Sequence, residues 1–538
     1  MPMIKLLDCT LRDGGYINDW EFGNSNLVNI FERLVSAGID IVEVGFLDER
    51  RAYDENRSIF PDTDAITKTY GLLDKGQSLI VGMIDYGTCG ISHVKPCSEG
   101  FLDGIRVIFK KQKMHEAIAF CHQIKQLGYK VFAQAVSITS YDDGEFQELL
   151  SLINELTPYA FSLVDTYGLL HKHKLMHYYN AAEQKLKKEI GIGYHAHNNF
   201  QLAYANCVEL LENPPKDRLL LVDGSLYGMG KSAGNTPIEL LAMYMNENGE
   251  KQYHSSQLLE AIDVTILDIY RKSPWGYNFK FFIAASHDCH PSYVSYLMDK
   301  QKLSVKSVHE ILDMLEGEKK LLYDGTYAEA LYVEYQKRVS GSEQDMAERL
   351  GELLGGKKVL MLGPGRNAVT EDYKVYEYMG RNRPVVIAVN CMPADYPVDY
   401  LFISSARRYV QLSCVISRMP KEVGLIATSN VTKTNGSFDY TLSYNELLDE
   451  EAWIVDNPMI MMIRLLSRYG VEQIALAGFD GYTTSPTSDY ANPNMAHSFS
   501  TQKAQSLNAD VESSLARIPN LAKLLFVTTT CYHIPEGN

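Results

Sequence analysis

Short apolar segments recur through the first part of the chain, with amphipathic stretches between them. They are rich in Val, Ile and Leu and are separated from one another by about 20 to 35 residues. Near-continuous apolar strands that alternate with helices are typical of a parallel sheet covered by helices, and eight such units close a (β/α)8 TIM barrel. The eight predicted strands are Ile4–Thr10, Ile39–Leu47, Leu79–Asp85, Gly104–Phe109, Lys130–Val136, Ala160–Thr166, Gly191–Asn198 and Leu219–Leu226.

The pattern changes after the eighth segment. Two mainly helical stretches are predicted at Ser255–Arg271 and Ser304–Leu315, and a linker containing Ser, Gly and Glu near Val339–Asp345. A new strand, Lys358–Leu362, then opens a second α/β alternation, which predicts an open doubly wound, Rossmann-like sheet. We therefore expect a TIM-barrel domain at 1–250, a helical extension that caps the barrel at 251–345, and a Rossmann-like domain at 346–538.

Composition limits the class of protein. A chain of 538 residues is too long for one hydrophobic core. The net charge of −16, with no cluster of Lys or Arg, argues against partners such as nucleic acid or a membrane surface. Nine scattered cysteines without a CxxC pair, and no leader or long apolar run, fit a reduced cytoplasm. We expect a cytoplasmic enzyme that forms a homo-oligomer.

Polar residues stand where each predicted barrel strand ends, and barrel active sites lie at these carboxyl ends. Taken singly, Glu43, Asp85, Gln134 and Asp223 have the character of ordinary barrel-lining residues. Their joint placement predicts one polar mouth. The full set is Arg12, Asp13, Glu43, Asp85, Arg106, Gln134, Asp165, His195, His197, Asp223 and Ser225.

Two His-x-His pairs occur, and their positions separate them. His195 and His197 lie on the seventh predicted strand, where residues i and i+2 face the same side, so both imidazoles point into the barrel mouth and suit one metal ion. His171 and His173 follow the sixth strand among lysines, as in a solvated loop or helix start. The alternative for the first pair is two structural barrel histidines.

Asp13 supplies a matching carboxylate, because a closed barrel places the first strand beside the eighth. Two histidines and one carboxylate suit Mn²⁺, Fe²⁺, Co²⁺, Zn²⁺ or Mg²⁺. The motif does not choose among these divalent metals, of which Mn²⁺ is our first expectation. Arg12 is placed to stabilise an oxyanion that develops on a bound carbonyl compound. Its alternative role is an ion pair that holds Asp13.

Three motifs together resemble a known family: LLDCTLRDGGY at the first strand, GYHAHNN at the seventh and GMGKSAGNTPIELL after the eighth. They look like the metallolyase barrels that include 4-hydroxy-2-oxovalerate aldolase, hydroxymethylglutaryl-CoA lyase and the isopropylmalate synthases. The resemblance implies that Asp13, His195 and His197 hold the metal and that Arg12 stabilises an enolate. It further implies two alternatives for Asn235, a distal metal ligand or a residue that shapes the site. The activity it implies is that of a carbon–carbon lyase or aldolase acting on a small 2-oxo acid.

One position departs from that family. The aldolases place a catalytic His three residues after the metal Asp, and this chain has Tyr16 there. A phenol can relay a proton, but its ordinary pKa of about 10 makes it a poor base near neutrality. Two alternatives stay open: a Claisen-type synthase that uses an acyl-CoA, and a barrel without catalysis that serves binding or assembly.

The glycine-rich turns are ambiguous in sequence. The turn with Lys231 suits either a phosphate- or carboxylate-binding turn or a tight loop with a solvated lysine. In the second domain, Gly363-Pro364-Gly365 could place backbone N–H groups against a phosphate. The turn does not match GxGxxG, and the next strand ends at Asn390 instead of the Asp or Glu typical of an NAD site. Asp480 and Asp489 lie on a later polar loop. Two alternatives stay open for this domain: it binds a small molecule, or it serves as a scaffold or oligomer-forming domain.

Overall fold

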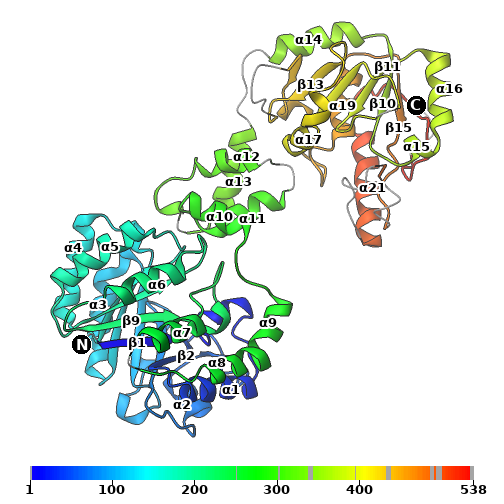
Figure 1. Ribbon diagram of the computed structural model, residues 1–538. Coiled ribbons are helices and arrows are strands. Elements are labelled where there is room, and N and C mark those ends of the chain that lie inside the picture. Colours follow the sequence, from blue (N-terminus) through cyan, green and yellow to red (C-terminus); the bar gives the residue numbers. More distant parts are fainter. Residues whose placement is uncertain are drawn as a thin grey trace. The chain divides into compact units, whose positions relative to one another are not determined.

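The computed structural model describes residues 3–249, 251–300, 303, 305–320, 322–336, 343–393, 395–431, 438–484, 490–491 and 500–533. The chain divides into two compact units (Figure 1). The first comprises Met1–Val294 with Lys320–Leu322, and the second comprises Ser295–Lys319 with Tyr323–Asn538. Each unit is described here by itself, and the domain limits 250 and 345 stay predictions.

The first unit is a closed parallel barrel, as the sequence predicts. Its sheet has the order β1-β9-β8-β7-β6-β5-β4-β2-β3, and β1 also pairs with β2, which closes the ring. Eight strands form the ring, and β3 is a two-residue addition beside β2. The strands are β1 (Met3–Asp8), β2 (Ile41–Leu47), β3 (Ile59–Phe60), β4 (Leu79–Asp85), β5 (Gly104–Phe109), β6 (Lys130–Ala135), β7 (Ala160–Asp165), β8 (Gly191–Ala196) and β9 (Leu219–Gly224).

Amphipathic helices cover the outside of the ring (Figure 1). In α4, buried Phe146, Leu149 and Ile153 recur at helical spacing, and a capping box of Asp142 and Glu145 starts the helix. The helices are α1 (Asn24–Ser36), α2 (Thr63–Tyr70), α3 (Met114–Gln126), α4 (Asp143–Leu156), α5 (Lys172–Lys185), α6 (Ala203–Glu212) and α7 (Ile238–Asn248). Their apolar faces and the strands form one continuous core.

Helices continue beyond the barrel. The stretch predicted at Ser255–Arg271 is helical throughout, as α8 (Ser255–Ala261), a π-helical turn (Ile262–Ile266) and α9 (Leu267–Lys272). The stretch predicted at Ser304–Leu315 contains α12 (Val305–Leu312), and Ser304 lies outside the described residues. The other helices here are α10 (Phe279–Ser286), α11 (Pro291–Asp299) and α13 (Gly325–Gln336). Most of the linker predicted near Val339–Asp345 falls outside the described part of the chain.

The second unit contains a seven-stranded parallel sheet of order β14-β13-β12-β11-β10-β15-β16. The order reverses between β10 and β15, so the sheet is doubly wound, as expected. Val359 and Met361 pack on one face and Leu360 and Leu362 on the other. The strands are β10 (Lys358–Leu362), β11 (Val385–Val389), β12 (Tyr400–Ile403), β13 (Gly424–Thr428), β14 (Tyr440–Leu442), β15 (Gln473–Ala477) and β16 (Lys523–Phe526). Its helices are α14 (Glu343–Leu354), α15 (Asn367–Thr370), α16 (Asp372–Asn382), α17 (Ala406–Gln411), α18 (Ser413–Ile416), α19 (Pro458–Arg468) and α21 (Thr501–Ala516).

Candidate metal centre

A tight turn follows β1 and fixes the first part of the site. The backbone N–H groups of Arg12 and Asp13 both donate to the carbonyl of Cys9, at 3.2 and 2.8 Å. The indole of Trp20 donates to the carbonyl of Arg12 at 2.7 Å. A side chain on Gly15 would collide with this indole, since an added Cβ would lie 2.0 Å from it. The turn therefore directs Arg12 and Asp13 into the barrel, where both are buried.

Asp13, His195 and His197 converge at the carboxyl ends of the strands. One ligand atom of each lies within 4.8 Å of the other two, and all three residues are buried. The Nε2 of His197 lies 4.0 Å from the Oδ2 of Asp13. β8 ends at Ala196, and His197 continues as an isolated antiparallel bridge with Asn235. The structure thus brings together the three side chains that the sequence predicted as metal ligands.

The other nitrogen of each imidazole has its own partner. The Nδ1 of His195 lies 3.1 Å from the Oδ2 of Asp223, and the Nδ1 of His197 lies 3.1 Å from the carbonyl of Lys231. Acceptors at these distances favour a proton on Nδ1 in both rings. This leaves each Nε2 as a lone-pair donor, the arrangement usual for metal-binding histidines.

Asn235 completes this group from the turn after β9. Its Nδ2 donates to the Oδ2 of Asp13 at 2.7 Å and to the carbonyl of Met229 at 3.2 Å. Its Oδ1 is buried and has no hydrogen-bond partner among the described residues. A buried acceptor without a donor costs free energy. The donor set of two imidazoles, a carboxylate and this amide oxygen fits a divalent cation.

A buried ion-pair network lies beneath the three side chains. Arg12 binds Asp13 at 2.6 Å through Nη1 and Glu43 at 2.8 Å through Nε. Arg106 binds the same carboxylate of Glu43 at 3.0 Å and is also paired with Asp223. Glu43 and Asp223, which have the character of ordinary lining residues in the sequence, therefore connect Arg12 with His195. Gln134 joins the network by accepting from Arg106 at 3.1 Å.

These charges set the ionisation of Asp13. Burial alone would raise the pKa of this carboxyl, but Arg12 and the two histidines outweigh burial and hold the pKa well below its ordinary value. Burial lowers the pKa of His197 to about 4, so its imidazole is neutral near pH 7. A charged carboxylate and neutral imidazoles are the forms that bind metal ions.

Tyr16 and Lys231 lie together at the rim of the mouth. The ring of Tyr16 packs against Trp20 and Phe46, with centroids 4.8 and 6.0 Å apart, and 45% of the residue is exposed. The ammonium of Lys231 lies 5.5 Å from the Tyr16 ring centroid. The protein around the hydroxyl, and then the charge of Asp13, raise the pKa of Tyr16 above its ordinary value. Tyr16 therefore stays a phenol near neutrality.

Asp165 and Asp85 also stand at the mouth. Burial raises the pKa of Asp165 to about 6, although its carboxylate accepts from the N–H groups of Leu169 and Leu170 at 2.8 and 3.0 Å. Burial likewise raises the pKa of Asp85. Ser225 is fully buried, and its hydroxyl has no hydrogen-bond partner among the described residues.

His290 also belongs to this region, although no pattern in the sequence points to it. It precedes α11, and its ring centroid lies 6.5 Å from that of Tyr167, which follows β7. Burial, and then the charges of Lys231 and Lys110, lower its pKa to about 4. Only the fold brings this residue near the turn after β9, because it follows the last barrel strand by more than 60 residues.

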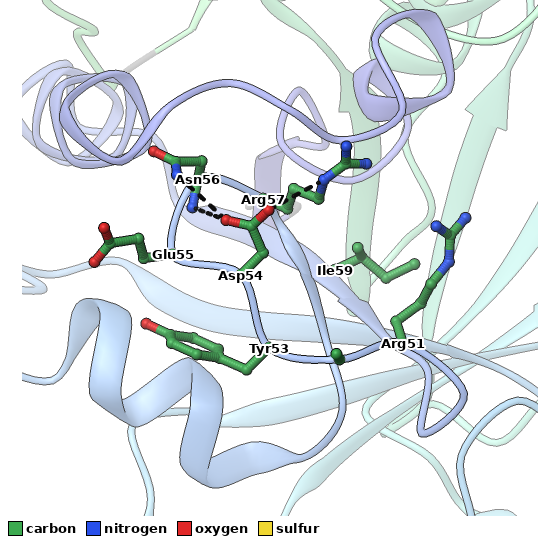
Figure 2. A pocket seen from close by; sticks show the side chains of 8 residues that line it. Arg51, Tyr53, Asp54, Glu55, Asn56, Arg57 and Ile59 are labelled. Carbon is green, nitrogen blue, oxygen red and sulfur yellow. Dashed lines mark hydrogen bonds and ion pairs between the residues drawn. The ribbon is translucent and has the colours of Figure 1, made fainter.

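Other candidates lie apart. His171 and His173 are exposed at the start of α5, as expected for a solvated helix start. The segment that connects β2 to β3 forms a hollow of about 570 Å³ (Figure 2). It is lined by Arg51, Ala52, Tyr53, Asp54, Glu55, Asn56, Arg57 and Ile59. Figure 2 shows Asp54 bonded to Asn56 and Arg57. This lining includes none of the three predicted metal ligands.

In the second unit, the glycine turn after β10 has a protein partner. The N–H of Gly365 donates to the carbonyl of Gly478 at 2.7 Å, and the N–H of Asn367 donates to the Asp480 carboxylate at 2.8 Å. An added Cβ on Gly363 would lie 2.4 Å from the Gly478 carbonyl oxygen. Because Gly363 and Gly365 lack side chains, the turn after β10 can contact the turn after β15. The carboxylate of Asp480 accepts from the N–H of Asn367 at this turn, which the sequence predicts as a possible phosphate site. Asp489 lies outside the described residues.

Known proteins match the barrel part of this chain. The family model HMGL-like matches residues 3–266. An oxaloacetate decarboxylase of Mycobacterium tuberculosis is 21% identical over 51% of this chain and 78% of its own length. A 4-hydroxy-2-oxovalerate aldolase of Pelotomaculum thermopropionicum is 24% identical over 46% of this chain and 72% of its own length. A solved HMG-CoA lyase from Brucella melitensis aligns with a TM-score of 0.39 and 14% identity, covering 48% of this chain and 96% of that one.

Among the described helices, none combines the length and apolar character that crossing a membrane requires. The matching motifs, the closed eight-stranded barrel and the family model agree over the same part of the chain. Residues 3–266 form a domain of the HMGL-like family.

Proposed function

We propose that the barrel is a divalent-metal-dependent carbon–carbon lyase or aldolase that makes or consumes the enolate of a 2-oxo acid. The convergence of Asp13, His195 and His197, with Arg12 fixed beside them, carries this proposal. The relatives named as an aldolase and as an oxaloacetate decarboxylase support it. Aldol cleavage of a 4-hydroxy-2-oxo acid and loss of the C4 carboxylate of oxaloacetate both pass through the enolate of pyruvate.

The residues for a metal are Asp13, the Nε2 atoms of His195 and His197, and the Oδ1 of Asn235. A bound divalent ion would act as a Lewis acid on the 2-oxo group and so acidify the C3–H bonds. Mn²⁺ is the first candidate, and Mg²⁺, Co²⁺ and Zn²⁺ suit the same donors. Asp223 and the carbonyl of Lys231 orient the imidazoles from behind.

Arg12 is the group proposed to stabilise the enolate oxygen. Its Nε and Nη1 are held by Glu43 and Asp13, so the guanidinium is fixed before any substrate arrives. Its Nη2 has no hydrogen-bond partner in the described part of the chain. A preorganised donor beside the site of developing negative charge lowers the barrier without a reorganisation cost.

Tyr16 is the group proposed to exchange a proton with the C4 hydroxyl of an aldol substrate. The phenol lies at the rim, beside the turn that carries Arg12 and Asp13. Because it remains protonated near neutrality, it acts as a hydrogen-bond relay rather than as a standing base. The position is the one at which the related aldolases carry a histidine.

Deuterium exchange tests this proposal. With the metal supplied, the wild-type protein should exchange the C3 protons of pyruvate with D₂O. Arg12→Ala should slow this exchange about 100- to 1000-fold, the usual cost of removing one oxyanion donor, while the protein keeps its metal. Tyr16→Phe should slow cleavage of a 4-hydroxy-2-oxo acid more than it slows exchange. An Arg12→Ala protein that exchanges at the wild-type rate would rule out the proposed enolate mechanism.

A further inference from the structure

Lys231 is held by the predicted metal site through its main chain. Its N–H donates to the Oδ2 of Asp13 at 3.3 Å, and its carbonyl accepts from the Nδ1 of His197 at 3.1 Å. The preceding Gly230 fits closely against Asp13 and Asn235. The position of the lysine relative to these side chains is therefore fixed by the fold rather than by a loose loop.

The side chain of Lys231 extends to the mouth, where it lies beside Tyr16. It is half-buried, and its ammonium lies 5.5 Å from the Tyr16 ring centroid. In the part of the chain that the structure describes, this ammonium forms no ion pair and no hydrogen bond. The alternative of a solvated lysine on a tight loop does not describe this geometry. A half-buried charge without a counter-ion is unfavourable, so an anion is the partner that such a group needs.

Within the ion-pair network of Arg12 and Arg106, the charges already balance for a substrate with one carboxylate. The buried network holds two guanidinium groups, Arg12 and Arg106, against the carboxylates of Asp13, Glu43 and Asp223. The net charge of this network is therefore −1. A divalent ion would change it to +1, and the carboxylate of the 2-oxo acid would offset that charge. The positive charge of Lys231 is not needed for this balance.

The rim is also positive when its other charged groups are counted. Lys231 experiences the charges of Asp13, Lys110 and Asp85. Lys110 offsets Asp85, the one rim carboxylate among these, and Asp85 forms no ion pair with Lys231 within 4.0 Å among the described residues. Lys231 thus stays available for a ligand.

We propose that Lys231 binds a second anionic group, at the far end of a 2-oxo acid substrate from its 2-oxo carboxylate. This inference rests on the proposed aldolase function and narrows its substrate class to 2-oxo acids with two acidic groups. The second group is a carboxylate or a phosphate, since an ammonium binds either as a point charge. Cleavage needs no further reactant: the C4 hydroxyl loses its proton, the C3–C4 bond breaks so that C4 becomes the carbonyl carbon of an aldehyde, and C3 of the resulting enolate takes up a proton to give pyruvate.

Three substrates with the same backbone separate the possibilities. 4-Hydroxy-2-oxopentanoate ends in a methyl group, 4-hydroxy-2-oxopentanedioate ends in a carboxylate, and 4-hydroxy-2-oxo-5-phosphopentanoate ends in a phosphate. All three release pyruvate, so one assay measures kcat/KM for each. Wild-type protein should favour at least one of the two substrates with a second anionic group over the methyl compound by about 10- to 100-fold, as expected for a charge-assisted contact. The better of these two identifies the anionic group.

The variant Lys231→Met keeps the length of the side chain and removes its charge. In this variant the ratio of kcat/KM for the preferred substrate with a second anionic group over the methyl substrate should fall about tenfold or more. Lys188→Met is the matched control, because Lys188 is exposed and pairs with Asp217 beyond the amino end of β8. This control should keep the wild-type ratio.

The outcomes distinguish the two proposals. If the wild-type protein cleaves the methyl compound as efficiently as the compounds that end in a carboxylate and in a phosphate, the role proposed for Lys231 is wrong while the aldolase function stands. The same holds if Lys231→Met keeps the wild-type ratio. If the metal-loaded wild-type protein releases pyruvate from none of the three and exchanges no C3 protons, the aldolase function itself is wrong. The wild-type comparison alone decides the matter if the variant does not fold.

Discussion

Gly230 shows how tightly single residues are fitted around the predicted metal ligands. An added Cβ would lie 2.3 Å from the Nδ2 of Asn235 and 2.6 Å from the Oδ2 of Asp13. Real Cβ contacts are longer than this, so a side chain at this position must displace one of the two partners. The glycine is required by close packing against the site, because its φ is not in the left-handed region.

Gly230→Ala is therefore expected to weaken metal binding, although Gly230 offers no ligand atom. The metal content of the purified protein should fall about tenfold or more, as it does when the groups that orient ligands are lost. His197→Ala should lose metal for the direct reason that a ligand is gone. Gly100→Ala is the control, since its nearest neighbours would lie 3.6 and 3.8 Å away. Full metal content in Gly230→Ala would show that Asp13 and Asn235 do not act together.

At the scale of residues, the sequence predicts the convergence of Asp13, His195 and His197 because strand periodicity and barrel closure are strong constraints. It could not assign roles to Glu43 and Asp223, because a buried carboxylate differs from ordinary barrel lining only through its partners. Here those partners are Arg12 and Arg106. No sequence pattern predicted that His290 lies at the barrel mouth. The polypeptide after the barrel reaches the mouth by tertiary packing, which no local pattern encodes.

At the scale of elements, the end of β1 is linked to the end of β9 through Asp8. Its carboxylate accepts from the N–H and from the hydroxyl of Thr10, both at 2.9 Å, and the Thr10 hydroxyl accepts from the N–H of Leu226 at 2.8 Å. Burial raises the pKa of Asp8 from 3.8 to about 7, although the bonds from Thr10 act in the opposite direction. In the folded barrel, Asp8 thus stays protonated up to about pH 7.

The contribution of Asp8 to the free energy of unfolding should consequently fall as the pH rises from about 4 to about 7. In this range the folded state keeps the proton on Asp8 while the unfolded state has released it. The loss is complete above about pH 7 and amounts to about 4 kcal/mol at most, by the relation of 1.36 kcal/mol to each tenfold change in acidity. Urea unfolding of the wild type and of Asp8→Asn at about pH 5 and pH 8.5 measures it.

Asp8→Asn should show the smaller decrease in stability between the two pH values, because its amide does not ionise. Asp263→Asn, at an exposed position, should behave as the wild type does. Equal pH dependence in the wild type and Asp8→Asn would mean that Asp8 is ionised in the folded barrel at both pH values.

The sequence also located the barrel strands well. The predicted strands Leu79–Asp85 and Gly104–Phe109 agree with β4 and β5 at both ends. Short strands were missed, among them β3 of two residues and β14 of three, since so few residues show no alternation of apolar and polar positions. The π-helical turn Ile262–Ile266 was likewise invisible, because one extra residue in a turn leaves the helical pattern almost intact.

At the scale of the whole molecule, the chain contains two units, and all the predicted metal ligands lie in the first. A protein that ends near Val339 should therefore retain metal binding and keep the segment Lys320–Leu322, which belongs to the first unit. The full-length protein is the reference, and metal content with circular dichroism is the measurement. An insoluble or metal-free product would mean that the domain boundary is wrong and that the two units depend on each other.

The ring closure between β9 and β1 has a consequence for how the barrel fails. Apart from the two-residue addition β3, the closed eight-stranded ring has no edge strand, so its main-chain N–H and C=O groups are not offered to other molecules. β1 is bonded on both sides, to β9 and to β2. Its loss would create two edges at once, both from strands with long apolar runs. A chain without residues 3–8 would for this reason recruit strands from its own copies and aggregate, rather than settle into a smaller barrel.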